Sequence, residues 1–118
     1  MSSLFTHSLR IYRKRSGLSQ REVSFLLGAK YKAKVSRYEN GHRLPPLRTA
    51  LAYATIFDVP LPKLFPTLQR KVEKEIVGRI LELETKLAEA QRQKRGSARA
   101  KRMLEWVKQR HAGITNTN

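Results

Sequence analysis

The segment from Ser19 to Asn40 constrains the fold most, because it contains the start and stop signals of two short helices. Ser19 has the character of an N-cap, and Glu22 three residues later completes the pattern of a capping box. Gly28 is a stop signal for the helix that begins there, and Asn40, followed by a glycine, ends the next helix. Two short helices with a glycine in the turn between them predict a helix-turn-helix unit.

Further helices are predicted on both sides of this unit within the first 66 residues. The first begins after a cap at Ser3 or Thr6, and the fourth spans Leu47 to Phe57, where apolar residues recur at helical spacing. The five helices of this part are expected to end near residues 15, 28, 39, 57 and 65. Because no strand pattern is convincing, the chain is predicted to be all-α.

Beyond Pro66 the apolar residues recur at spacings of four, four, three, four and three, close to a heptad seam. We expect this seam to pair with a second copy of the chain, because an apolar stripe of this length needs a partner face and the last helix, about 98–111, is short. The alternatives are a partner protein, and packing within the chain against Met103, Leu104, Trp106 and Val107. The seam itself consists of Val72, Ile76, Ile80, Leu83, Leu87 and Ala90.

These patterns divide the chain into a domain at 1–66, a helical extension at 67–112 and a disordered tail at 113–118. Between the two helices of the extension, the run 91–102 is basic, and it either contacts phosphates without specificity or is a disordered linker. Trp106 is expected to be buried in the contact between the helices of the extension rather than to stack on bases.

Basic residues outnumber acidic residues in both parts of the chain. The 118 residues include 25 Lys and Arg against 9 Asp and Glu, which gives a net charge of +16. Up to Pro66 there are 12 basic and 3 acidic residues, and beyond it there are 13 and 6. An excess this large indicates a polyanionic partner, with generic surface basicity as the alternative.

Several classes of site are excluded by residue content. The chain has no cysteine, and its three histidines lie far apart without metal-ligand spacing. No paired carboxylates, nucleophile–histidine pair or phosphate-cradling loop is recognisable, so we expect no metal, no cofactor and no enzymatic activity. The absence of an apolar run near the roughly 20 residues of a membrane span, and of a signal-peptide core, leads us to expect a cytoplasmic, nucleoid-associated protein.

The third predicted helix carries the residues best suited to recognition. Val35 and Tyr38 fall at i, i+3 spacing and are expected to face the core. A basic, hydrogen-bonding helix start suits the major groove of DNA, and the alternative is a helical hairpin with a solvated basic face. The residues left exposed by this arrangement are Lys32, Lys34, Ser36 and Arg37, with Lys30 and Tyr31 just before them.

Two stretches are informative in combination, Gly17 to Gln20 and Val35 to Gly41. They are accompanied by Leu9, Tyr12-Arg13, Val23, Leu27-Gly28, Arg43, Pro45, Leu47 and the helix to Phe57-Asp58-Val59. Through these landmarks, about half of the chain resembles the Xre/Cro/lambda-repressor type of helix-turn-helix domain. The resemblance implies a five-helix domain that binds duplex DNA, usually as a transcriptional regulator and often as a dimer.

The resemblance also implies roles for individual residues. Gln20 and Asn40 match positions that contact the DNA backbone, whereas Ser36 and Arg37 match positions of the recognition helix that reach base edges. The full set of predicted DNA-binding residues is Gln20, Lys30, Tyr31, Lys32, Lys34, Ser36, Arg37, Asn40 and Arg43.

Arg13 and Glu39 match a pair that forms an internal salt bridge in relatives. A structural role is therefore expected for both residues in spite of their charges.

The sequence departs from the commoner family pattern in the turn before the recognition helix. Six residues separate Gly28 from Val35, one more than usual. The turn is therefore predicted to be one residue longer, which moves Lys30, Tyr31 and Lys32 relative to the groove.

The chemistry of each side chain leaves alternatives open. Arg37 either donates two hydrogen bonds to a guanine or contacts a phosphate. Lys32 and Lys34 favour phosphate, because lysine is a flexible point charge. Tyr31 either packs on the second helix or stacks on a sugar, and Arg43 either contacts the DNA backbone or is solvated.

These observations predict a sequence-specific transcriptional regulator of the repressor type, which inserts the helix at about 32–39 in the major groove of duplex DNA. The alternative from another class is an antitoxin-like module that binds RNA or an acidic protein.

Overall fold

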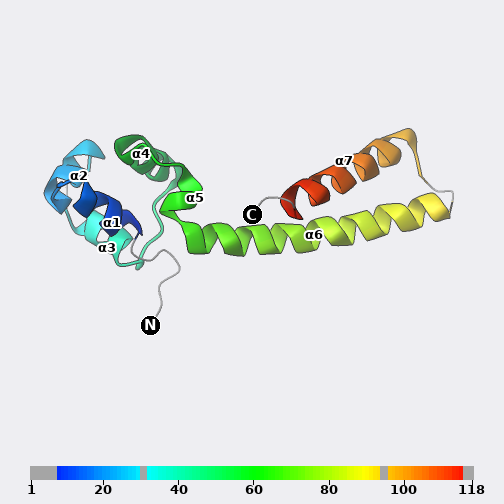
Figure 1. Cartoon of the computed structure of the whole chain (residues 1–118), viewed down its shortest axis with the longest axis horizontal. Helices are drawn as coiled ribbons and strands as arrows, with labels where there is room; N and C mark the ends of the chain where they lie inside the picture. The colour runs from blue at the N-terminus through cyan, green and yellow to red at the C-terminus, as the bar shows by residue number, and fades with distance from the viewer. Residues whose placement is uncertain (1–7, 30–31, 94–95, 116–118) are drawn as a thin grey trace. The chain divides into compact units, whose positions relative to one another are not determined.

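The computed structural model describes residues 8–29, 32–93 and 96–115 of the chain. These residues form seven helices and no strand, so the prediction of an all-α chain is confirmed (Figure 1). The chain divides into two compact units, Met1–Arg70 and Lys71–Asn118, which we call unit 1 and unit 2. Unit 1 contains α1 (Ser8–Arg15), α2 (Gln20–Leu26), α3 (Lys32–Glu39), α4 (Leu47–Phe57), α5 (Leu61–Leu64) and the start of α6 (Pro66–Arg92), and unit 2 contains the rest of α6 and α7 (Ala98–Thr115).

The capping box predicted at the start of α2 is present. The Ser19 hydroxyl accepts a hydrogen bond from the Glu22 backbone N–H at 3.1 Å, and the Ser19 backbone N–H donates to the Glu22 carboxylate at 2.8 Å. The hydrogen bond from the Ser19 backbone lowers the pKa of Glu22, because it stabilises the ionised carboxylate. The start of α2 is therefore set by two reciprocal bonds that satisfy orphan donors.

Glycines in the left-handed conformation end the two helices of the helix-turn-helix. Gly28 has a φ of 74°, and the bonds from Gly28 N–H to Phe25 C=O and from Ala29 N–H to Ser24 C=O form a Schellman motif. The end of α3 repeats this pattern around Gly41, whose φ is 73°. A side chain at either position would be strained in this backbone conformation, so the glycines determine where the chain turns.

The core of unit 1 takes buried side chains from every one of its five short helices. Tyr53 lies at its centre, edge-on to Tyr38 with ring centroids 6.3 Å apart and stacked on Phe57 at 6.0 Å. Each fully buried apolar side chain of this size contributes about 1.5–3 kcal/mol to stability. The buried residues are Leu9, Val23, Val35, Tyr38, Tyr53, Leu64 and Phe65.

The hydroxyl of Tyr53 is buried and has no hydrogen-bond partner in the described part of the chain. Burial raises the pKa of Tyr53, and the nearby carboxylate of Glu39 raises it further, because both oppose a phenolate charge. Tyr53 thus stabilises unit 1 through its apolar ring, whereas its buried hydroxyl without a partner destabilises the folded state.

Replacing Tyr53 with phenylalanine is expected to leave the free energy of unfolding at neutral pH unchanged, or to raise it by up to about 1 kcal/mol. The pKa of Tyr53 in the folded protein is raised above its unfolded value of about 10, so the folded state holds the phenol proton more tightly than the unfolded state. The contribution of this difference to the free energy of unfolding is fully present below about pH 10 and is lost as the pH rises further. Wild-type protein should therefore lose stability in alkali more steeply than the variant, as measured by denaturant unfolding at neutral pH and near pH 11. A variant that is the more alkali-sensitive of the two would contradict this account.

In unit 2, α6 and α7 run side by side and share an apolar contact (Figure 1). Ile80 and Leu87 of α6 and Val107 of α7 are buried there, and the packing around them includes Leu83, Ala100, Met103, Leu104 and Ile114. Much of the seam is thus covered by the same chain, which corrects the expectation that the whole seam pairs with a second copy. Of the other three seam residues, Ala90 is half-buried, and Val72 and Ile76 are 44% and 41% exposed.

Trp106 corrects a second expectation, because its side chain is 57% exposed rather than buried. Val107, the next residue, is fully buried, and successive residues of a helix are rotated by about 100°. Met103, Leu104 and Val107 therefore occupy the side of α7 that faces α6, and Trp106 lies on a neighbouring face.

The end of α7 also differs from the sequence-based expectation. The helix continues to Thr115, so residues 113–115 are helical and do not belong to the predicted tail. Residues 116–118 lie outside the described residues.

Candidate nucleic-acid interface

Helix α3 has two chemically distinct faces. Val35, Tyr38 and Glu39 are buried against the rest of unit 1. Lys34 and Arg37, three residues apart and therefore neighbours on the helix surface, are exposed on the other face. The side of α3 that faces solvent is thus basic, and the side that faces the core is held by apolar packing and one carboxylate.

Glu39 is that carboxylate, and it joins three helices. Its side chain accepts hydrogen bonds from Arg13 Nε at 2.5 Å and from the Arg13 terminal guanidinium nitrogen at 3.0 Å, both from α1. It also accepts a bond from the Gln20 side-chain amide of α2 at 3.1 Å. Arg13 in turn donates to the Leu18 carbonyl at 3.1 Å. The residues assigned a structural role from the sequence are therefore in direct contact, and they tie α3 to α1 and α2.

The hydrogen bond to Glu39 raises the pKa of Arg13, and burial of the guanidinium acts in the opposite direction. Glu39 is 2% exposed, so its charge is compensated by protein groups and not by water. Arg10, one helical turn before Arg13, lies with its Nε 4.0 Å from the same carboxylate and remains partly exposed. Neither the position of Arg10 nor the bond from Gln20 was predicted from the sequence, although the spacing of Arg10 and Arg13 on one helix face was a usable signal.

Gln20 has a role in this network in addition to its predicted DNA contact. One N–H of its amide is directed to Glu39. An amide nitrogen carries two N–H donors, so the second remains for a phosphate. The network thus fixes the position of a side chain at the start of α2, and the predicted contact with the DNA backbone stays a prediction.

The other predicted residues lie on or just after α3. Asn40 is exposed, and its side-chain amide donates to the hydroxyl of Ser36 at 3.4 Å. Arg43 is exposed in the loop between α3 and α4. Within residues 8–29, 32–93 and 96–115, no ion pair engages Lys34, Arg37 or Arg43. These cations are therefore available to an external anion.

For three of the predicted DNA-binding residues, the structure describes no side chain. Lys30 and Tyr31 lie outside the described residues. Lys32 is the first residue of α3, which is as far as the structure describes it. The prediction of a longer turn before α3 rests on the same residues and stays a prediction.

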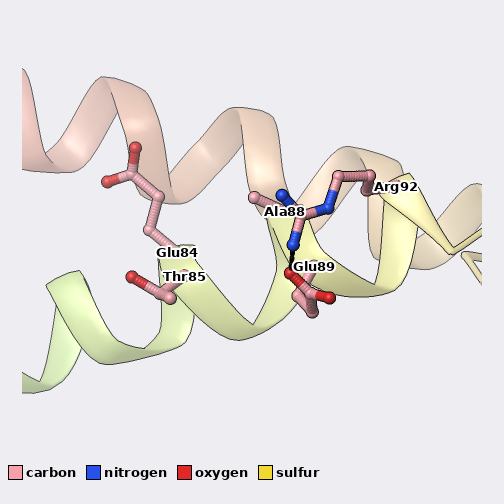
Figure 2. Close-up of a pocket in the computed structure, with 5 residues that line it drawn as sticks. All are labelled: Glu84, Thr85, Ala88, Glu89 and Arg92. Carbon is pink, nitrogen blue, oxygen red and sulfur yellow. Dashed lines mark hydrogen bonds and ion pairs between the residues drawn. The ribbon is translucent and has the colours of Figure 1, made fainter.

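A surface pocket in unit 2 lies along α6 (Figure 2). Its charged groups are used within the unit, because Arg92 pairs with Glu89, and Glu84 lies 3.4 Å from the ring of His111. We therefore assign no binding role to this pocket, whose lining residues are Glu84, Thr85, Ala88, Glu89 and Arg92.

The described residues contain no group of three or more His, Asp or Glu side chains arranged to hold a metal ion. In the same ranges, no helix has the length and apolar character needed to cross a membrane.

Comparison with known proteins agrees with the geometry of unit 1. A family model described as helix-turn-helix matches residues 9–64. No curated protein and no solved structure matches the chain. The matched segment begins in α1 and ends at the last residue of α5, and it contains the α2–turn–α3 unit and the Arg13–Glu39 pair. Residues 9–64 are therefore a helix-turn-helix domain of the Xre/lambda-repressor-like type, which is a DNA-binding class.

Proposed function

We propose that the protein is a sequence-specific transcriptional regulator that inserts α3 into the major groove of duplex DNA. The observation that carries the proposal is the division of α3 into a core face tied to α1 and α2 through Glu39 and a basic face with Lys34 and Arg37 exposed. A rigidly held helix that presents basic side chains meets the geometric need of major-groove recognition. The protein would thus act by binding, at the nucleoid, and not by catalysis.

Each exposed residue has a distinct task in this proposal. Arg37 donates two hydrogen bonds to a guanine, which contributes about 1–3 kcal/mol of discrimination between bases. Lys34 contacts phosphate, and Ser36 lies beside the base edges. Gln20 and Asn40 flank the helix and bind the DNA backbone, which sets the register of α3 in the groove.

We also propose that the regulator is a homodimer. Val72 and Ile76 are the exposed part of the apolar seam, one helical turn apart on α6. Pairing of this short stripe with its copy would bury apolar surface that α7 leaves open. A dimer related by a two-fold axis would read two inverted half-sites, spaced by about 34–36 Å or a multiple of that distance.

Selection of bound sequences from a random duplex pool tests both proposals. We expect enrichment of one motif in two inverted copies. The logarithm of the binding constant should fall linearly with the logarithm of the salt concentration, with a slope of about −0.9 per phosphate contact. Double-stranded RNA of random sequence and equal length is the control, and it should bind more weakly at every salt concentration. A pool without an enriched motif, or tighter binding to double-stranded RNA, would overturn the regulator, and a single unrepeated half-site would overturn the dimer alone.

A further inference from the structure

Four exposed residues of α7 form a strip along one side of the helix. Arg99, Arg102, Trp106 and Arg110 follow one another at spacings of three, four and four residues, which places them in one narrow sector of the helix surface. The sector spans about 16 Å along the helix axis, from the rise of about 1.5 Å per residue. We call these four residues the arginine–tryptophan strip.

Packing in unit 2 leaves the strip without an internal role. The apolar face of α7 is already complete, because Val107 is fully buried against α6 with Met103 and Leu104 beside it. Trp106 nevertheless is 57% exposed, although an indole is among the side chains that gain most from burial. The ring therefore contributes little to the fold of unit 2, and it presents an open aromatic surface.

The charges of unit 2 are divided unequally between its helices. Helix α6 contains six basic and five acidic residues, whereas α7 contains five basic residues and a single acidic one, Glu105. In the described parts of the chain, no ion pair engages Arg99, Arg102 or Arg110. Three guanidinium groups on the same strip as an exposed indole thus remain available to an external ligand.

The chemistry of the strip fits one class of ligand best. Guanidinium groups bind phosphates in planar, paired geometry, and an exposed indole provides a surface on which a base can stack. In duplex DNA the faces of the bases are already stacked on one another. A duplex therefore offers Trp106 no free base, and its phosphates could be contacted only by the arginines. A membrane surface requires the apolar face of an amphipathic helix, and in α7 that face is covered by α6.

We propose that the arginine–tryptophan strip is a second nucleic-acid site that binds single-stranded nucleic acid, with Trp106 stacking on an unpaired base and the arginines contacting the flanking phosphates. The site is separate from α3 and stands whether or not α3 reads a specific duplex sequence. It gives the helix-turn-helix protein a contact for unpaired nucleotides in addition to the duplex.

Trp106 makes the proposal directly measurable, because it is the only tryptophan in the chain. The full chain is titrated with a single-stranded oligothymidylate, with an abasic oligomer of the same length and with a random duplex, while tryptophan fluorescence is recorded. We expect quenching by the single strand alone, since stacking requires a free base. Unchanged emission with the single strand, or equal quenching by the abasic oligomer or the duplex, would overturn the proposal.

Variants separate stacking from charge, with affinity measured by the anisotropy of a labelled single strand. Trp106→Ala is expected to weaken binding about 5- to 150-fold, the range for loss of one stacked base, and Trp106→Phe should retain most of the affinity. Arg102→Gln should weaken binding more than Lys108→Gln, the matched loss of one charge from an exposed position of α7 outside the strip. Equal affinities for wild-type protein and Trp106→Ala would overturn stacking.

Duplex binding distinguishes this site from the proposed function of α3. Trp106→Ala should leave affinity for a selected duplex unchanged, and Arg37→Ala should leave single-strand quenching unchanged. Loss of both activities in either variant would show that one surface serves both ligands, and would overturn the second site.

Discussion

Glu39→Ala is expected to destabilise unit 1 by about 3–5 kcal/mol, the usual cost of removing one partner of a buried ion pair. Arg13 remains charged in the variant, because a guanidinium does not lose its proton at neutral pH. Its side chain is only 12% exposed, and its Nε and one terminal nitrogen would lose their acceptor. Gln20 would lose its acceptor at the same time. A unit of about 70 residues has a total stability of about 4–10 kcal/mol, so a large part of it would be lost.

The aromatic residues allow this effect to be assigned to one unit. All four tyrosines occur before residue 54, and the single tryptophan, Trp106, occurs in unit 2. Denaturant unfolding followed by tyrosine circular dichroism should shift strongly in Glu39→Ala, whereas the transition of tryptophan emission should not. Glu82→Ala, which removes an exposed carboxylate from α6, is the matched control and should change neither signal. A shift of less than about 1 kcal/mol in the tyrosine transition, the range of surface pairs, would show that Glu39 does not hold α3 in place.

Arg37→Ala is expected to weaken binding to a selected duplex by about 5- to 150-fold, which corresponds to the loss of about 1–3 kcal/mol for one paired contact with a base. Binding to random duplex should weaken much less, because a base contact contributes only where the right base is present. Lys34→Ala is the matched control on the same face of α3. Because Lys34 is proposed to contact phosphate, Lys34→Ala should reduce affinity for all duplexes alike and should lower the slope of the salt dependence by about one unit.

Arg37→Lys sharpens the same experiment. Lysine keeps the positive charge but cannot reproduce the planar pair of donors, so the variant should behave like Arg37→Ala on the selected duplex and like wild type on random duplex. Equal losses of Arg37→Ala on the two duplexes would assign Arg37 to phosphate, and specificity would then have to come from other residues of α3.

Local signals in the sequence were sufficient for the fold of unit 1. The capping box at Ser19 and the glycine after Asn40 act within a few residues, so both helix ends could be predicted without knowledge of the tertiary structure. The prediction of an all-α fold and the resemblance to the helix-turn-helix family were both confirmed. Gln20 shows the limit of such signals, because its bond to Glu39 joins residues 19 positions apart, and the packing that brings them together is not encoded in either neighbourhood.

The extension was harder to predict than the first unit. Periodicity identified the apolar stripe of α6 but not its partner, since a second copy and α7 offer the same kind of surface. Trp106 was assigned to the contact by its size, yet its rotation of about 100° from Val107 places it on another face. Hydrophobicity thus identified which helices carry an apolar stripe but not which helices pair, and the helical phase of individual residues decided which side chains are covered.

The shared carboxylate at the end of α3 has a consequence for how such a domain can diverge. Arg13, Gln20 and Glu39 satisfy one another, so a change at one of them is tolerated only if the other two change with it. Lys34 and Arg37 are one to two residues away from the buried positions of the same helix. They are exposed and take no part in the hydrogen bonds of Glu39, so either can change by itself. A lineage can therefore replace the exposed residues of α3 one at a time, which under the proposed function would change how it binds DNA, while the three coupled residues are inherited as a single unit.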